Sequence, residues 1–198
     1  MPRPVMKKLR QQQLIDATLV SVERHGLQHT TINTISGFAG MSSGIISHYF
    51  GGKQGLIEAT LRYLIDELKQ ALLIRTSGKT LSPAVRLSMI VEANFTELQR
   101  SEAVAKTWLS FWAQAMHDPG LARFQHINNQ RLYSNLLFSF KQLLPATDAM
   151  NAAKQSAAMI DGFWLRSALS STPEEDFKQA QILSKAFIKA LIAQHGEN

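Results

Sequence analysis

The chain of 198 residues contains no cysteine, so it has neither a disulfide framework nor a metal site built on thiolates. It also lacks any apolar run near the roughly 18 residues that a membrane-spanning helix needs. Its first residues, MPRPVMKKLR, form a charged amphipathic pattern rather than an apolar leader. We therefore expect a cytoplasmic protein that does not enter a membrane.

The motifs of several enzyme classes are absent as well. The sequence has no P-loop, no dinucleotide fingerprint and no nucleophile elbow, and its six histidines lack the spacing of metal ligands. These absences argue against an enzyme, and we expect neither a cofactor nor a metal. Strand-like alternation of apolar and polar residues is missing too.

Apolar residues instead recur at helical spacing along nearly the whole chain, which predicts an all-α fold. Thr30 and Ser42 are expected to cap the second and third helices, and Gly51-Gly52 to end the third. The expected helices are 7–25, a short segment after Thr30, 43–50, 53–75, 83–99, 102–117, 120–143, 148–170 and 173–194. We expect a small N-terminal domain over 1–52, a connecting helix over 53–75 and a larger helical domain over 76–198.

Positive charge is concentrated near the N-terminus. The net charge is +6, and residues 1–54 carry six basic side chains against two acidic ones. Such a block suggests an anionic partner such as nucleic acid, although the solvated face of a helix would give the same count. It lacks the broad basic amphipathic helix typical of membrane-surface binding. The basic residues are Arg3, Lys7, Lys8, Arg10, Arg24 and Lys53.

The stretch SSGIISHYFGGK, residues 42–53, has the pattern of a recognition helix that follows a glycine turn. Gly44 lies in its first turn, where the missing side chain would let the backbone approach a base edge or phosphate. Ile45 is suited to a thymine methyl group and Ser47 to a base edge. The sequence therefore predicts a helix-turn-helix that reads a DNA major groove.

Three further side chains are expected to contact phosphates, namely His48, Tyr49 and Lys53. Lys53 would begin the fourth helix, where a cation opposes the helix dipole unless an anion is bound there. The alternative is a small three-helix bundle whose surface happens to be polar.

Residues 30–50, TTINTISGFAGMSSGIISHYF, closely resemble the helix-turn-helix of TetR-family repressors, and the match continues to Leu56. This resemblance implies a dimer that binds double-stranded operator DNA, and Thr31, Ser42 and Ser43 complete the expected DNA contacts. The chain departs from the family where Gly37, Phe38 and Gly51-Gly52 replace usually charged residues. Some phosphate contacts are therefore expected to be missing.

Further segments resemble the choline-responsive branch of this family, which represses genes for the synthesis of glycine betaine and for choline uptake under osmotic stress. These segments are RQQQLIDATL (10–19), LIEAT (56–60), TWLSFWAQAMHDP (107–119), RLYSNL (131–136) and IDGFWLR (160–166). The resemblance implies a repressor that choline or a related quaternary ammonium relieves. A different cationic or hydrophobic ligand, or a protein partner, remains an alternative.

Aromatic residues and a carboxylate mark the candidate effector site. A quaternary ammonium is held by aromatic faces with an acidic group nearby, and tryptophans on facing helices with Asp161 could form such a cage. An aromatic stripe at helical spacing also fits an ordinary core, and Asp161 could pair with Arg166 or another base. The expected ligand-binding residues are Trp108, Phe111, Trp112, Met116, Asp161 and Trp164.

The last two expected helices carry broad apolar faces with many small residues. In TetR-family proteins these helices pair across a two-fold axis, so the resemblance implies a homodimer through them. The faces consist of Ala149, Ala152, Ala153, Ser156, Ala157 and Ile160 on one helix, and of Ile182, Leu183, Ala186, Ile188, Ala190 and Leu191 on the other.

Overall fold

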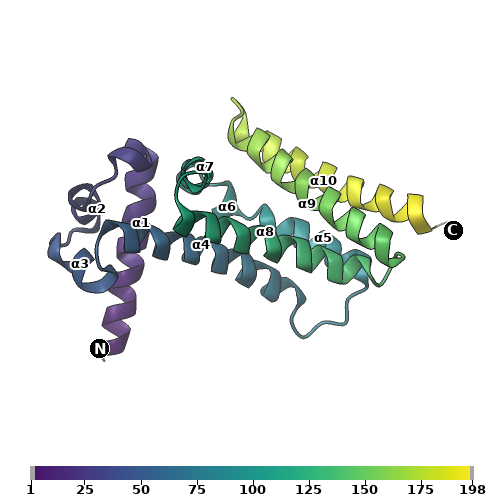
Figure 1. The fold of residues 1–198 in the computed structure, drawn as a ribbon, viewed down its shortest axis with the longest axis horizontal. Helices are drawn as coiled ribbons and strands as arrows, with labels where there is room; N and C mark the ends of the chain where they lie inside the picture. Colours follow the sequence, from purple (N-terminus) through teal and green to yellow (C-terminus); the bar gives the residue numbers. More distant parts are fainter. Residues whose placement is uncertain (1–2, 197–198) are drawn as a thin grey trace. The chain divides into compact units, whose positions relative to one another are not determined.

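The structure is a computed structural model, and it describes residues 3–196. All secondary structure in this part of the chain is helical, which confirms the predicted all-α fold (Figure 1). The helices are α1 (Arg3–His29), α2 (Ile32–Ala39), α3 (Gly44–Phe50), α4 (Lys53–Thr76), α5 (Pro83–Asn94), α6 (Glu97–Arg100), α7 (Glu102–Ala115), α8 (Pro119–Phe140), α9 (Ala146–Ala168) and α10 (Pro173–Gly196). Among the described helices, none is long and apolar enough to cross a membrane.

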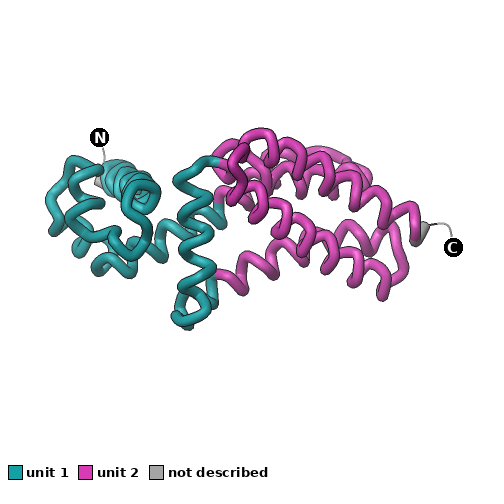
Figure 2. The backbone as a smooth tube through the Cα atoms, turned by 90° about the horizontal axis from the view of Figure 1, so that it is seen from above, with its two compact units in different colours: residues 1–66, 101–124 teal, residues 67–100, 125–198 magenta. Residues whose placement is uncertain are grey.

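The chain forms two compact units (Figure 2). Unit 1 comprises residues 1–66 and 101–124, and unit 2 comprises residues 67–100 and 125–198. Helix α4 therefore contributes its first part to unit 1 and its last part to unit 2. These units are defined by packing, and the predicted functional division into 1–52, 53–75 and 76–198 stays a prediction.

The core of unit 1 joins the first four helices. Leu14 of α1, Ile35 of α2, Ile46 of α3 and Leu56 of α4 are each 0% exposed and lie in one apolar cluster. Apolar and small residues at helical spacing along α1 are buried, namely Leu14, Ile15, Ala17, Thr18, Ser21 and Val22. Helix α7 packs against α1 in the same unit. The recognition helix, only seven residues long, is thus held by tertiary packing rather than by its own helical propensity.

Helix α1 differs from its predicted bounds at both ends. It begins at Arg3, and it bends at Gly26 (φ 72°, ψ 162°) before a last turn that ends at His29. The expected cap for α2, Thr30, is wrong, because its buried hydroxyl donates to the Gly26 carbonyl at 2.8 Å. Thr31 caps α2 instead: its side chain accepts from the Thr34 N–H at 3.1 Å.

The beginning of α3 also differs from the prediction. Ser43, not Ser42, is its N-cap residue, and the Ser43 side chain makes no capping hydrogen bond. The Ser42 carbonyl accepts from the Ile45 N–H at 3.1 Å, so the chain already turns tightly at Ser42. The hydroxyls of the two serines are therefore not engaged in capping α3.

Close backbone packing joins the end of α3 to the beginning of α4. A Cβ added at Gly55 would overlap the carbonyl oxygen of Phe50. Gly51 ends α3 with φ 73°, a left-handed conformation that glycine adopts at little cost. The connection between the two helices is therefore short and tightly fitted.

The predicted helix over 83–99 is wrong, because the chain divides it into α5 and α6. Phe95 ends α5 with non-helical dihedrals (φ −118°, ψ 31°) and is 2% exposed. Thr96 then begins the next turn, and its hydroxyl accepts from the Gln99 N–H at 3.4 Å. Burial of the Phe95 ring explains why the helix ends here, although neither glycine nor proline marks the position.

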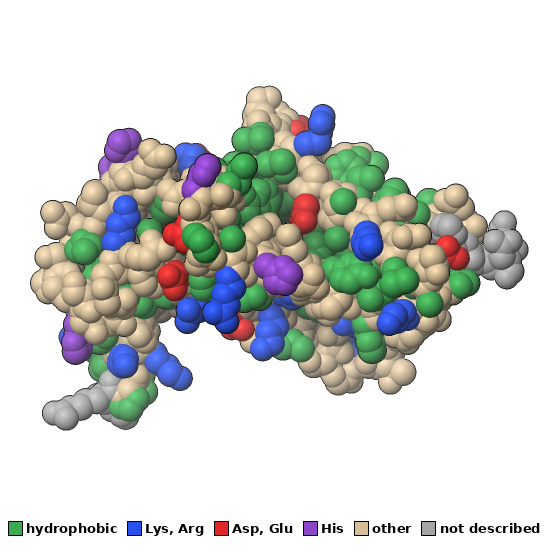
Figure 3. Space-filling view, in the orientation of Figure 1, with side chains coloured by type: hydrophobic (Ala, Val, Ile, Leu, Met, Phe, Trp, Pro, Cys, Tyr) green, Lys and Arg blue, Asp and Glu red, His purple; other side chains and the backbone are tan. Residues whose placement is uncertain are grey.

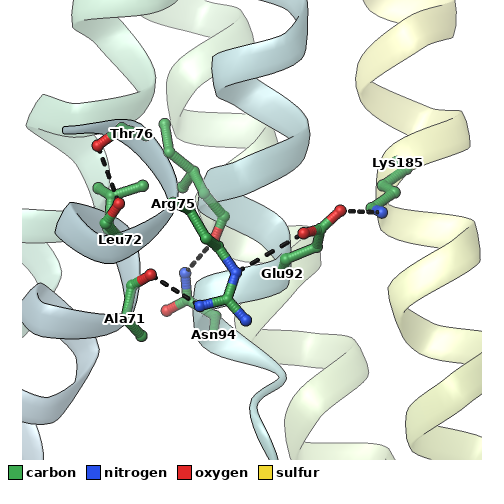
Figure 4. A network of polar contacts seen from close by, with 8 residues as sticks. Ala71, Leu72, Arg75, Thr76, Glu92, Asn94 and Lys185 are labelled. Carbon is green, nitrogen blue, oxygen red and sulfur yellow. Dashed lines mark hydrogen bonds and ion pairs between the residues drawn. The ribbon is translucent and has the colours of Figure 1, made fainter. Parts of the chain in front are cut away.

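Unit 2 is held by helix packing and by a network of charges. Helix α10 packs against both α9 and α5. Glu92 of α5 accepts from Lys185 of α10 at 2.6 Å and lies 3.6 Å from the Arg75 Nε of α4 (Figure 4). Arg75 also donates to the Ala71 carbonyl. One carboxylate thus links three helices of this unit.

Candidate DNA-binding and effector sites

The recognition helix presents the predicted polar face to solvent. Gly44, Ser47 and His48 are exposed, whereas Ile45 and Tyr49 are half-buried against the apolar cluster of unit 1. A Cβ on Gly44 would meet no protein atom within 4 Å. Gly44 is therefore not required by packing inside the chain, in contrast to Gly55.

The other predicted DNA contacts surround this face. Thr31, Ser42 and Ser43 are exposed, and Lys53 is half-buried as the first residue of α4. The His48 and Tyr49 rings lie 5.0 Å apart, centroid to centroid, on consecutive positions of α3. DNA binding by these individual residues stays a prediction.

Phe38, which replaces a usually charged residue, has a structural role. Its ring stacks on His25 at 5.9 Å with an interplanar angle of 26°, and the Arg24 guanidinium lies 5.1 Å from its centre. The ring therefore joins α2 to the end of α1 and holds Arg24 by a cation–π contact. No local pattern in the sequence predicts this contact.

The aromatic residues of α7 lie together within unit 1. The Trp108 ring is 5.7 Å from Phe111 and 6.4 Å from Trp112. Trp108 and Phe111 are buried, and Phe111 borders a closed cavity of about 10 Å³, room for about one water molecule. Trp112 is half-buried, whereas Met116 is 81% exposed. Trp112 thus retains more accessible surface than Trp108 or Phe111.

Asp161 and Trp164 belong to α9 and therefore to unit 2. Asp161 is half-buried, and among the described residues no hydrogen bond or ion pair to its carboxylate is found. Burial raises the pKa of Asp161 to about 6, and the nearby charge of Arg131 partly opposes that rise. The expected partner Arg166 is exposed, and the base whose charge acts on Asp161 is Arg131.

Arg131 is the centre of a polar cluster that sequence reasoning missed. Its Nη2 donates to the Asn94 side chain at 3.2 Å and to the Asn128 side chain at 3.4 Å. Its buried Nε has no hydrogen-bond partner in the described part of the chain. Burial lowers the pKa of Arg131 to about 10, opposed by Asp161. Only the resemblance of the RLYSNL segment could have drawn attention to this arginine.

Trp164 is fixed by its surroundings in unit 2. Its indole N–H donates to the Gln99 carbonyl at 3.2 Å, and its ring lies 5.9 Å from Phe177 of α10. The side chain is 7% exposed. The structure thus brings together the α7 aromatics in unit 1, and separately Asp161, Arg131 and Trp164 in unit 2. A cage that combines both groups stays a prediction.

The apolar faces predicted for the last two helices are partly buried within the single chain and partly exposed. Most of the α9 face is already buried within the single chain, as are Ile188 and Leu191 of α10. Ile182 and Leu183 of α10 are 61% and 39% exposed, and Leu169 after α9 is 68% exposed. Apolar surface therefore remains uncovered mainly along α10 and at the α9–α10 turn.

Two family models cover most of the chain. A model of bacterial regulatory proteins of the TetR family matches residues 14–60. A model of the C-terminal part of BetI-type transcriptional repressors matches residues 83–193.

Named relatives agree with these matches. The chain is 50% identical over 185 residues to the HTH-type transcriptional regulator BetI of Serratia proteamaculans. This alignment covers 93% of the present chain and 92% of the Serratia protein. It is 47% identical over 194 residues to the BetI of Paraburkholderia phymatum, with 98% of each chain covered. Among solved structures, a transcriptional regulator of Saccharomonospora viridis in complex with choline is similar in fold, with a TM-score of 0.77 at 19% identity over 90% of this chain and 95% of that one.

These relatives are transcriptional regulators, which confirms that the protein is a regulator and not an enzyme. The predicted TetR-type resemblance is confirmed over nearly the full length of the chain. The chain therefore belongs to the TetR family and, within it, to the BetI-type transcriptional repressors.

Proposed function

We propose that the protein represses genes for the conversion of choline to glycine betaine and for choline uptake, and that choline or a related quaternary ammonium relieves this repression. It acts in the cytoplasm as a homodimer on operator DNA. Ligand binding changes the separation of the two recognition helices, which must remain near 34–36 Å, or about one DNA turn, to occupy successive major grooves.

The proposal that choline is the ligand rests on the carboxylate of Asp161. Its carboxylate is half-buried, and in the described part of the chain it has neither a hydrogen bond nor an ion pair. A carboxylate in this state gains from a bound cation, because the ligand's charge replaces the hydration that burial removes. The choline bound by the similarly folded regulator of Saccharomonospora viridis supports the same class of ligand.

Aromatic faces complete the proposed site. Trp112 and Trp164 supply indole rings, and a quaternary ammonium gains about 0.5–2 kcal/mol from each face that it contacts. Trp108 and Phe111 are buried in unit 1, and the Trp108 ring lies 5.7 Å from the ring of Phe111 and 6.4 Å from that of Trp112.

The homodimer forms through α9 and α10. Ile182, Leu183 and Leu169 expose large apolar side chains there. Covering them in a two-fold interface removes apolar surface from water, at about 25 cal/mol for each Å². A dimer also supplies the two recognition helices that a palindromic operator requires.

The test is operator binding and calorimetry. Wild-type protein is bound to labelled DNA from upstream of its own gene, and choline is expected to release it. A neutral analogue of choline with a tert-butyl group should release it much less. In calorimetric titration, Asp161→Asn should weaken choline, and Trp112→Leu should weaken it a few-fold to about thirty-fold.

Choline affinity should also fall as the pH drops below about 6, because the raised pKa of Asp161 lets the carboxylate take up a proton there. The exposed Asp66→Asn serves as the matched control and should bind choline as the wild type does. The proposed site would be contradicted by unchanged choline affinity in both test variants, or by a Trp112→Leu protein that unfolds. Either result would indicate that these residues stabilise the fold and do not bind the ligand.

One observation favours a second candidate function. The positive charge of Arg131 already acts on Asp161 and partly compensates it without a ligand. In that case the repressor responds to a different ligand or to a protein partner, and choline leaves operator binding unchanged.

A further inference from the structure

The helix-turn-helix of this chain contains no strong cation. Residues 25–52 include neither lysine nor arginine, and both α2 and α3 lie within this range. Neutralisation of phosphates by lysine and arginine supplies most of the sequence-independent affinity for DNA. The necessary cations must therefore come from other parts of unit 1.

Several cations of unit 1 are already engaged within the chain. Arg24 lies over the Phe38 ring, Arg62 pairs with Glu58 at 3.6 Å, and Lys106 pairs with Glu102 at 2.7 Å.

Lys7 and Arg10 of α1 are exposed. In the described part of the chain, neither has a hydrogen bond or ion pair. The first acidic residue of the chain is Asp16, so no carboxylate precedes Lys7 or Arg10.

These two cations continue the face of α1 that carries Leu14. Leu14 lies in the apolar cluster with Ile46 of the recognition helix. Lys7 and Arg10 fall within about 40° of Leu14 around the helix axis, and about 10 Å and 6 Å before it along the axis. This end of α1 projects beyond α3 (Figure 1), and Lys and Arg side chains gather around it (Figure 3). Lys8 points about 120° away from Leu14.

We propose that Lys7 and Arg10 form a second DNA-binding surface, which contacts the phosphate backbone beside the major groove that α3 occupies. The occupant is double-stranded DNA, because the surface is cationic, has no hydrogen bond or ion pair in the described part of the chain, and continues the α1 face whose Leu14 shares the apolar cluster with Ile46 of α3. Each side chain neutralises a phosphate and thereby positions α3 without reading bases.

Salt dependence of DNA binding tests this proposal. Binding of Lys7→Gln to labelled duplex DNA from upstream of the gene is measured between about 0.05 and 0.3 M salt. One lost phosphate contact in each of two protomers should lower the slope of log K against log salt by about 1.8, and affinity at 0.1 M salt by about sixty-fold. Arg10→Gln should behave alike, and the loss should be the same on duplexes of unrelated sequence.

Lys8→Gln is the matched control, because it removes the same charge one residue away on another face. It should leave the slope within about 0.5 of the wild type. An equal loss in Lys7→Gln and Lys8→Gln would indicate general attraction by net charge and overturn the assigned surface. An unchanged slope in Lys7→Gln, with circular dichroism showing a folded protein, would overturn it as well. Choline is absent throughout, so the outcome is independent of the effector.

Discussion

Replacing Asp161 by asparagine should make the protein more stable while it weakens the proposed effector site. The folded state raises the pKa of this carboxyl from an ordinary 3.8 to about 6, so it binds the proton more tightly than the unfolded chain. The free energy of unfolding therefore falls as the pH rises through this window. At 1.36 kcal/mol for each pH unit, the ionised carboxylate costs up to about 3 kcal/mol above pH 6.

Part of the Asp161 carboxylate reaches solvent, which reduces the expected gain to between about 1 and 3 kcal/mol at neutral or alkaline pH. The raised pKa already includes the attraction of Arg131, which opposes the effect of burial. Asparagine has nearly the same shape and carries no charge, so it removes the cost of desolvation. The gain should shrink below about pH 6 and vanish below about pH 3, where aspartate is protonated in both the folded and the unfolded state.

Urea unfolding followed by circular dichroism measures this difference at about pH 8 and about pH 5, with protein concentration fixed because the protein is proposed to dimerise. Asp66→Asn, on an exposed position of α4, should leave the midpoint nearly unchanged. A lower stability of Asp161→Asn at about pH 8 would refute the reasoning. It would show that attraction to Arg131 exceeds the cost of burial and that Asp161 is a structural ion-pair partner.

Five other substitutions test the DNA-binding unit and the charge network. Gly55→Ala should lower the free energy of unfolding by about 3 kcal/mol or more, because its Cβ has no room, whereas Gly44→Ala should keep thermal stability and lose operator affinity in anisotropy titrations. Tyr49→Phe should weaken binding to all DNA sequences alike, and Ser47→Ala should relax discrimination at particular base pairs by roughly 1–3 kcal/mol, as competition with mutated operators would show. Glu92→Gln leaves two cations without their shared partner, and urea unfolding should show a loss of about 1 kcal/mol.

The sequence predicted the helices most reliably where local signals and tertiary packing agree. Pro83 and Pro173 begin helices as expected, because proline fixes a helical φ at a position that needs no N–H donor. The sequence failed at Phe95, where a buried ring ends α5 without any local breaker. The sequence-based prediction also named Thr30 instead of Thr31 as the N-cap of α2. Which of two adjacent threonines caps a helix depends on whether its hydroxyl already has another hydrogen-bond partner. Thr30 donates to Gly26, a contact that only the bend in α1 creates.

The candidate sites were predictable to different degrees. The exposed face of α3 follows from helical periodicity, since Ile46 must point inward and Ser47 and His48 then point outward. The surroundings of Asp161 could not be derived in the same way. Arg131 precedes it by 30 positions, and pairing between distant charges depends on the packing of helices. Burial, which sets the pKa of both groups, has no local signature in the sequence.

The missing side chain at Gly55 has a mechanical consequence. Because the Phe50 carbonyl occupies the space of a Cβ there, the end of the recognition helix and the first turn of α4 have no clearance to slide or pivot against each other. Within unit 1, we therefore expect a tilt of the first turns of α4 to move the end of α3 with it. The part of α4 that belongs to unit 1, residues 53–66, spans about 21 Å, and a tilt of a few degrees over that length displaces its end by about 1 Å. The absence of a side chain at Gly55 is therefore what allows the recognition helix and α4 to pack this closely.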